Sequence, residues 1–391
     1  MRDWKIVKLG DVFDLQMGKT PDRKNLDFFS TTDNKWISIA DISKSDKYIF
    51  ETKEYISDEA VKKSGIKQIP ANTVIMSFKL SIGKTAITKE PMYSNEAIMA
   101  FLPNGKYDVD NDFLYHLFSN KDWTEGSNKA VKGITLNKAS LLEAKILLPP
   151  LTIQKQIAKV MDKCTEIISK NERMLENYDS LIKSRFIEMF GDPVTNPMGW
   201  KIGKMNDITT KITDGEHGTV PRCDCNGNLY LMARNVSQNN TLDLSEVSFI
   251  PEENHNKIYK RCNPENGDLL LVCVGATVGK TCLVPEMKEF SMARSLALLK
   301  PDYTKINSLF LLNLVSSFFI QNQIQNCVHA AAQAGLYTNM IKDLKVYIPP
   351  LELQNDYAAF VQQIDKSKFA VQKSLEKAET LYKSLMQEYF V

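Results

Sequence analysis

The segment Leu148-Pro149-Pro150-Leu151-Thr152-Ile153-Gln154 occurs twice in the chain, the second time as Ile348-Pro349-Pro350-Leu351-Glu352-Leu353-Gln354. Neither residues 152–190 nor residues 352–390, which follow the two copies, contain a proline or a glycine. Those two residue types are the least favourable in the interior of a helix, so each stretch predicts one long helix. At 1.5 Å per residue, each helix would be about 55–60 Å long.

Further repeated segments indicate that the whole chain is a tandem duplication. The opening residues 4–12 recur in altered form at 200–208, and Ile82-Gly83-Lys84-Thr85 recurs as Val278-Gly279-Lys280-Thr281. The landmarks keep the same order, and their offset changes only from 196 to 200 residues. A period of half the chain is far longer than the repeat of a solenoid protein.

Each half begins with a region of mixed pattern before its long helix. Short apolar runs such as Trp36–Ile39 and Leu269–Val272 are separated by Gly, Pro and Asn, which is typical of strands and turns. We therefore predict an α+β protein with two similar mixed α/β domains, separated by two long helices and related by a pseudo-twofold internal duplication. The predicted divisions are residues 1–150 and 191–350 for the two domains, and 151–190 and 351–391 for the two helices.

Apolar residues in both helical stretches recur at the three-, four- and seven-residue steps of a coiled coil. Domains of about 150 residues are shorter across than these helices. We therefore expect the helices to pair with each other as a coiled-coil spacer, with pairing to the helices of a partner as the alternative. The expected contact residues are Ile157, Val160, Ile167, Met174 and Leu181 in the first helix and Phe360, Ile364, Val371 and Leu381 in the second.

The composition excludes several classes of protein. Among 391 residues, 43% are hydrophobic and 25% are charged, as in folded globular proteins. With 49 Lys and Arg against 47 Asp and Glu, nucleic acid would be bound through local patches rather than bulk charge. No apolar run reaches the roughly 20 residues of a membrane span, and the N-terminus lacks the apolar core of a signal peptide. We therefore expect a cytoplasmic protein.

Motifs for catalysis and metal binding are incomplete. Residues 275–281 resemble a phosphate-binding loop, but three residues separate the glycines where four are required, so a tight turn with an exposed lysine is preferred. Cys223-Asp224-Cys225 lacks the Cys-x-x-Cys spacing of zinc sites, which favours buried thiols. No nucleophile elbow or dinucleotide fingerprint occurs. The sequence predicts no catalytic residue, no metal and no cofactor.

Taken in order and found twice, these motifs resemble the specificity (S) subunits of type I restriction–modification systems. The matching features are the Trp-Lys-x-x-Lys-Leu-Gly-Asp-Val opening, Trp36-Ile37-Ser38-Ile39-Ala40-Asp41-Ile42, the Gly-Lys-Thr turn, Pro-Pro-Leu-x-x-Gln before the helix and Phe190-Gly191-Asp192-Pro193 after it. The second copy departs from the pattern at residues 205–207 and 230–236.

The resemblance implies a non-catalytic subunit with two target-recognition domains, each reading one half of a bipartite double-stranded DNA site. The helices would set the unread spacer and dock two methyltransferase (M) subunits and, in the full complex, restriction (R) subunits. S-adenosylmethionine, ATP and Mg are expected on those partners. The alternatives are a DNA-independent assembly protein that acts through its coiled coil, and the recognition part of a fused methylase-nuclease.

Candidate DNA-contacting residues follow from side-chain chemistry, because Lys, Arg and hydroxyl groups in loops suit phosphates and Arg, Asn and Lys suit base edges. They are Lys19, Thr20, Arg23, Lys79 and Lys84 in the first half and His217, Arg222, Arg234, Asn235, Lys280 and Arg294 in the second. An ordinary solvated surface position is the alternative for each. Lys84 and Lys280 stand out because they occupy duplicated positions.

Overall fold

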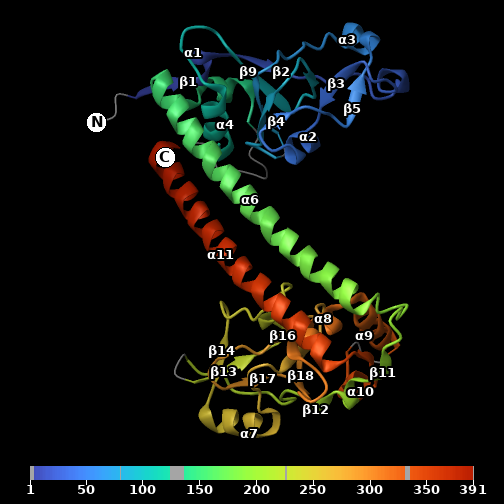
Figure 1. Cartoon of the computed structure of the whole chain (residues 1–391). Coiled ribbons are helices and arrows are strands. Elements are labelled where there is room, and N and C mark those ends of the chain that lie inside the picture. The colour runs from blue at the N-terminus through green and yellow to red at the C-terminus, as the bar shows by residue number, and fades with distance from the viewer. Residues whose placement is uncertain (1–3, 80, 124–135, 225–226, 331–334, 391) are drawn as a thin grey trace. The chain divides into compact units, whose positions relative to one another are not determined.

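The computed structural model of the chain describes residues 4–79, 81–123, 136–224, 227–330 and 335–390 (Figure 1). The chain forms two compact units: unit 1 consists of Met1–Glu172 with Lys373–Val391, and unit 2 consists of Arg173–Gln372. Both predicted long helices are present, as α6 (Leu151–Phe190) and α11 (Leu351–Phe390). Each unit therefore combines one region of mixed structure with one part of each long helix.

The described residues of unit 1 form three sheets and five short helices. The five-stranded sheet has the order β2 (Phe13–Met17), β9 (Ile98–Pro103), β6 (Val74–Ser77), β7 (Thr85–Thr88) and β4 (Tyr48–Ile49). The three-stranded sheet has the order β5 (Glu54–Ile56), β3 (Asn34–Ile37) and β8 (Tyr93–Ser94). In the third sheet, β1 (Lys5–Lys8) pairs with β10 (Lys145–Leu148). The helices are α1 (Leu9–Val12), α2 (Ile39–Lys44), α3 (Asp58–Ser64), α4 (Asn111–Asn120) and α5 (Lys138–Glu143).

Unit 2 repeats this plan. Its four-stranded sheet has the order β12 (Thr209–Asp214), β18 (Leu296–Pro301), β15 (Leu269–Val272) and β16 (Thr281–Leu283). Its three-stranded sheet has the order β14 (Ser248–Ile250), β13 (Asn228–Leu231) and β17 (Phe290–Met292). As in unit 1, two further strands pair with each other, β11 (Lys201–Lys204) with β19 (Lys345–Ile348). The helices are α7 (Glu252–Cys262), α8 (Ser308–Ser316), α9 (Phe318–Ala330) and α10 (Thr338–Asp343).

The strand pairings identify equivalent positions in the two units. In each three-stranded sheet the central strand, β3 or β13, has one antiparallel and one parallel neighbour. Trp36 of β3 lies opposite Glu54, and Tyr230 of β13 lies opposite Ser248. Trp36 is therefore equivalent to Tyr230, and Glu54 to Ser248. The shared topology confirms the predicted α+β fold with an internal duplication.

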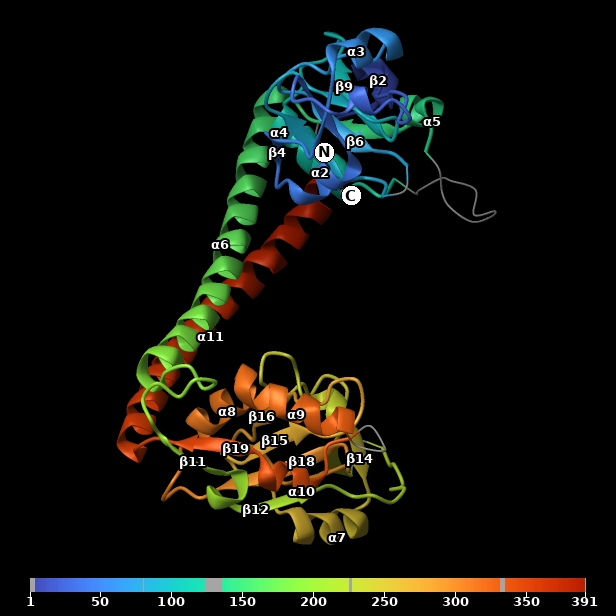
Figure 2. The same cartoon turned by 90° about the vertical axis from the view of Figure 1, so that its right-hand side faces the viewer.

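The two long helices run antiparallel to each other within each unit (Figures 1 and 2). In unit 1, the Asn171 amide donates to the Ser374 hydroxyl at 3.1 Å. In unit 2, Lys368 lies 2.5 Å from the Asp179 carboxylate, and the rings of Phe186 and Tyr357 are 5.5 Å apart. The prediction that the helices pair with each other is confirmed within each unit.

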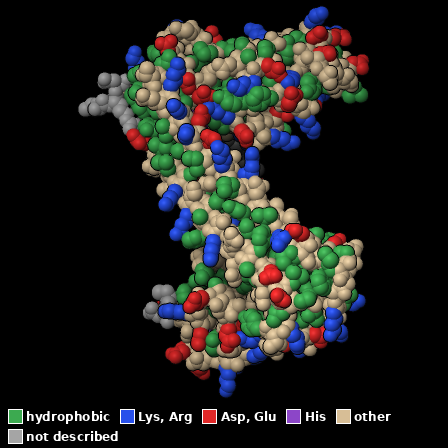
Figure 3. Space-filling model, in the orientation of Figure 1, with side chains coloured by type: hydrophobic (Ala, Val, Ile, Leu, Met, Phe, Trp, Pro, Cys, Tyr) green, Lys and Arg blue, Asp and Glu red, His purple; other side chains and the backbone are tan. Residues whose placement is uncertain are grey.

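The predicted contact residues of the two helices differ in how far they are buried. Ile157, Ile364 and Val371 are buried and Phe360 is partly buried, whereas Val160, Ile167, Met174, Leu181 and Leu381 are 42–51% exposed. The buried side of α6 instead includes Met161, Cys164, Asn171 and Ile182. The helix α6 carries two adjacent apolar stripes with the same seven-residue period, so spacing alone selects the wrong one. Hydrophobic side chains accordingly reach the surface over the long helices (Figure 3).

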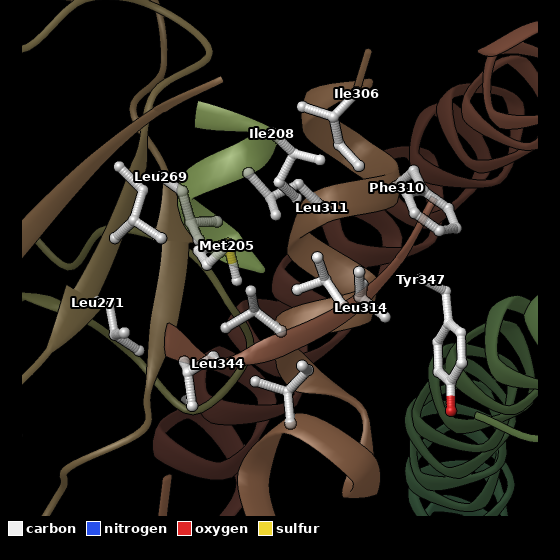
Figure 4. Packing of buried hydrophobic residues seen from close by; sticks show 14 of the residues in the cluster. Met205, Ile208, Leu269, Leu271, Ile306, Phe310, Leu311, Leu314, Leu344 and Tyr347 are labelled. Carbon is white, nitrogen blue, oxygen red and sulfur yellow. The ribbon is translucent and has the colours of Figure 1, made fainter. Parts of the chain in front are cut away.

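The four-stranded sheet of unit 2 is buried on both faces. Leu269 and Leu271 of β15 point toward α8, where they pack near Leu311 and Leu314 (Figure 4). The alternate residues Leu270 and Val272 belong to the cluster that contains Ile258 of α7. This alternation is the period of a strand buried on both faces.

The ends of the long helices complete the core of each unit. Phe190 of α6 lies 4.7 Å from Phe310 of α8, and Phe390 of α11 lies 5.6 Å from Phe113 of α4, measured between ring centroids. The helices are therefore structural parts of both folded regions. None of the described helices is long and apolar enough to cross a membrane.

The repeated glutamine of the Pro-Pro-Leu-x-x-Gln motif anchors the start of each long helix. Gln354 is fully buried; its carbonyl accepts from the Asn307 backbone N–H at 2.9 Å, and its amide donates to the carbonyls of Pro349 at 2.8 Å and Lys305 at 3.1 Å. Gln154 makes the equivalent three bonds in unit 1. The motif thus satisfies buried backbone groups where the strand passes into the helix.

Candidate nucleic-acid interface

Three loops of unit 1 meet beside the end of β2. The Lys19 backbone N–H donates to the Ser94 carbonyl at 2.8 Å, which joins the segment after β2 to the end of β8, where the turn to β9 begins. The Phe78 N–H donates to the Ala97 carbonyl at 3.0 Å, which brings the β6–β7 loop to the same turn. We call residues 19–20, 78–79 and 94–97 the loop junction of unit 1. It gathers the predicted residues Lys19, Thr20 and Lys79.

Unit 2 contains the same junction at residues 216–217, 273–274 and 292–295. The Glu216 N–H donates to the Met292 carbonyl at 2.9 Å, and the Arg294 N–H donates to the Glu216 carbonyl at 3.0 Å. The Cys273 N–H donates to the Ser295 carbonyl at 2.8 Å. This junction therefore brings together the predicted residues His217 and Arg294, although Arg294 comes about eighty residues after His217 in the chain.

A glycine precedes each junction where two backbones cross closely. A Cβ on Gly18 would lie 2.2–2.3 Å from atoms of Ser94 and Asn95, and a Cβ on Gly215 would lie 2.2–2.3 Å from Met292 and Ala293. Any larger residue would separate the loops. This role was not predicted from the sequence, although the glycine that follows each of the two duplicated strands was a signal for it.

The duplicated Gly-Lys-Thr segments form tight turns, as predicted. Gly83 and Gly279 have φ values of 87° and 96°, a conformation that favours glycine. The exposed Lys84 amine donates to the Ser43 hydroxyl at 2.6 Å. Lys280 is partly exposed, and its side chain has no ionic or hydrogen-bond partner in the described part of the chain. Both turns lead directly into a strand, β7 or β16, rather than into a helix.

Near the loop junction of unit 1, two predicted side chains, one basic and one with a hydroxyl group, donate hydrogen bonds to carboxylates. Arg23 donates two hydrogen bonds to Glu54, at 2.6 and 2.9 Å, and its guanidinium lies over the rings of Phe29 and Trp36 at 4.3 and 4.7 Å. The hydrogen bond from Arg23 holds the pKa of Glu54 below its ordinary value. The Thr20 hydroxyl donates to Glu96, and this bond lowers the pKa of that carboxyl.

The predicted residues of unit 2 have different partners. His217 lies 2.6 Å from the Asp214 carboxylate, and the Arg234 guanidinium donates to the Ser248 hydroxyl at 2.9 Å. Arg222 lies 4.4 Å from the centre of the Tyr230 ring and donates to the Val220 carbonyl at 2.9 Å. These side chains are therefore held by local contacts, but within the described ranges only His217 among them faces a carboxylate.

Asn235 does not fit the predicted role. Its side chain is buried, and its amide donates to the backbone carbonyls of Asp243 and Glu246 at 2.9 and 3.0 Å. Its carbonyl accepts from the Met232 N–H at 3.0 Å. All of these bonds organise the loop around it, so Asn235 is a structural residue and its assignment as a DNA contact is wrong.

Most cysteines described by the structure are buried, which fits the interpretation as thiols in the core. Burial raises the pKa of the Cys273 and Cys282 thiols to about 12. Cys223 is exposed instead, and Cys225 lies outside the described residues. Within the described ranges, no group of three or more His, Cys, Asp and Glu side chains could hold a metal ion.

Comparison with known proteins identifies a family for almost the whole chain. Residues 1–177 and 197–379 each match the family described as "Type I restriction modification DNA specificity domain". The two matched stretches coincide with the two halves of the duplication.

Individual relatives agree with this match. The chain is 24% identical over 382 residues to the type I restriction enzyme EcoprrI specificity subunit of Escherichia coli, covering 92% of this chain and 87% of the relative. It is 26% identical over 235 residues to the MjaIX specificity subunit of Methanocaldococcus jannaschii, a match that spans 55% of this chain and about half (54%) of that relative. The crystal structure of a type I S subunit from M. genitalium shares the fold, with a TM-score of 0.65, 14% identity and coverage of 100% and 96%.

Proposed function

Since the chain belongs to the type I restriction–modification DNA specificity family, we propose that residues 1–150 and 191–350 are two target-recognition domains that each bind one half of a bipartite DNA site. The observation that carries this proposal is the duplicated loop junction, which presents different side chains on the same backbone frame. Lys19 and Thr20 of unit 1 are replaced by Glu216 and His217 in unit 2. Equivalent frames with different polar groups suit the reading of two different sequences.

We assign the unread gap between the half-sites to the paired helices α6 and α11. The exposed apolar stripe of α6, which consists of Val160, Ile167, Met174 and Leu181, is the surface on which we place the methyltransferase (M) subunits. A seven-residue period is the pattern that a helix of a partner would recognise. Restriction (R) subunits would join this complex, and S-adenosylmethionine, ATP and Mg would bind to the partners. This chain would contribute recognition and no catalytic residue.

Base-resolution methylation sequencing tests the proposed function directly. The chain is expressed with its cognate methyltransferase subunit, and the host methylome is compared with that of cells lacking this chain. We expect a two-part motif with a constant gap, methylated only when the chain is present. An unchanged methylome in cells where the complex assembles would contradict the proposal and favour an assembly protein.

Lengthening both helices should change the gap and leave the half-sites unchanged. Seven residues inserted after Glu172 and seven after Gln372 preserve the heptad seam within each unit. Seven helical residues add about 10 Å, so we expect the methylated motif to gain about three base pairs between its halves. The same seven residues inserted after Gly105, in the loop after β9, serve as the control and should leave the gap unchanged. A change in either half-site would argue against the helices as spacer.

A further inference from the structure

The two units hold an arginine over an equivalent aromatic ring. The guanidinium of Arg23 lies 4.7 Å from the Trp36 ring centre, and that of Arg222 lies 4.4 Å from the Tyr230 ring centre. Trp36 and Tyr230 occupy the same position in the central strands β3 and β13. Stacking on a ring fixes the plane of a guanidinium and leaves its edge to make hydrogen bonds.

The residue across the sheet determines whether that edge is available. Glu54, opposite Trp36, accepts two hydrogen bonds from Arg23, so the charge of this arginine is neutralised and its donor fork is occupied. The equivalent residue opposite Tyr230 is Ser248. A serine cannot accept a two-pronged bond from a guanidinium, and the Ser248 hydroxyl already accepts from Arg234.

Arg222 is therefore stacked and oriented, but it has no carboxylate partner among the residues that the structure describes. One amino group donates to the Val220 carbonyl, and the other lies 3.8 Å from the Met232 sulfur, a weak acceptor. Burial raises the pKa of Tyr230, and a hydrogen bond from Arg222 opposes that rise. The side chain is exposed, and it makes no ion pair with the described residues. Its remaining donors have the geometry that matches two acceptors side by side.

We propose that Arg222 determines specificity for a guanine in the half-site bound by unit 2, whereas Arg23, held by Glu54, reads no base in the other half-site. Guanine presents its O6 and N7 acceptors together in the major groove, and arginine is the side chain that most often binds both. The inference rests on the proposed function, because it assigns one contact within the DNA interface proposed above.

The first experiment determines the methylated motif for the wild type, Arg222→Gln and Arg23→Gln, each expressed with the cognate methyltransferase subunit. The half-site of unit 2 is identified by exchanging residues 191–350 for those of a specificity subunit with a known target. We expect Arg222→Gln to lose its preference at one guanine of that half-site by about tenfold to a hundredfold. Arg23→Gln should leave the base preferences of the other half-site unchanged.

A second experiment tests the contact on purified complexes and guards against a folding defect. Duplexes in which single guanines are replaced by 7-deazaguanine lack the N7 acceptor. One such replacement should weaken binding of the wild type but not of Arg222→Gln. Ser248→Glu, which places a carboxylate opposite Tyr230, should reproduce the loss of guanine preference, and Ser248→Gln should not.

The possible outcomes distinguish a failure of the proposed function from a failure of the inference about Arg222. A wild type that methylates no bipartite motif overturns the proposed function. A wild type with a motif, but with no guanine in the half-site of unit 2 or with the guanine retained by Arg222→Gln, overturns the inference alone. Equal weakening of all sequences by Arg222→Gln would identify a phosphate contact and also overturn it.

Discussion

Replacing Gln354 with alanine should lower the free energy of unfolding of unit 2 by about 2–4 kcal/mol. The substitution removes three hydrogen bonds from a fully buried position and leaves the Asn307 N–H and the carbonyls of Lys305 and Pro349 without their partner. A buried backbone group that loses its partner keeps its desolvation cost, which is larger than the net gain from an ordinary hydrogen bond. Urea denaturation of the full chain measures the change.

Gln363→Ala is the matched control, because Gln363 lies exposed on the same helix. It should change the unfolding free energy by less than about 0.5 kcal/mol. Hydrogen exchange locates the effect, since Gln354→Ala should lose protection in the backbone of residues 305–310 and at the start of α11. Equal stabilities of the two variants would show that the buried glutamine does not anchor the helix.

Replacing Ile167 with glutamate should abolish assembly with the methyltransferase subunit while the chain remains folded. Ile167 is 44% exposed in the centre of the α6 stripe, so a charge there meets water in the free chain. In a helix–helix interface the same charge would be buried without a partner, at a cost large enough to reduce affinity by tenfold or more. Size-exclusion chromatography of the co-expressed subunits measures assembly, and thermal unfolding measures the folded state.

Two further variants give this experiment its controls. Ser169→Glu places the same charge on an exposed position of α6 away from the stripe and should leave assembly intact. Ile364→Glu puts the charge at a position that is only 9% exposed, so the chain itself should be destabilised by several kcal/mol. Normal assembly of Ile167→Glu would place the partner on another surface.

The sequence predicts the elements of this protein better than it predicts their contacts. The two helices follow from the absence of Pro and Gly, which is a local property of the chain. The packed side of α6 does not follow, because Val160 and Met161 are both apolar neighbours and only tertiary packing selects Met161, which joins the core of unit 1. Composition cannot distinguish two stripes that share one period.

The candidate interface shows the same division between local and tertiary information. Asn235 was a reasonable base-reading residue by chemistry, but asparagine is equally suited to bonding the backbone of its own loop, as it does here. The Arg23–Glu54 pair could not be predicted, because the residues are 31 positions apart and meet only through the β3–β5 register. The turns at Gly83 and Gly279 were predictable because a glycine with positive φ is a local requirement.

Unit 1 is built from two separate stretches of the chain, and this affects the order in which the units fold during synthesis. Its core includes Phe113 from the first third of the chain and Tyr389 and Phe390 from residues 373–391, which the ribosome adds after all of unit 2. The core of unit 1 is therefore completed only after residues 373–391 are added, and until then Phe113 lacks the Phe390 ring that packs 5.6 Å from it. Unit 2 has all of its residues in one continuous stretch and can close first. Synthesis thus begins with unit 1, but unit 2 can complete its folding first. A nascent chain stalled near residue 372 would hold one complete unit and one incomplete unit that chaperones could still bind.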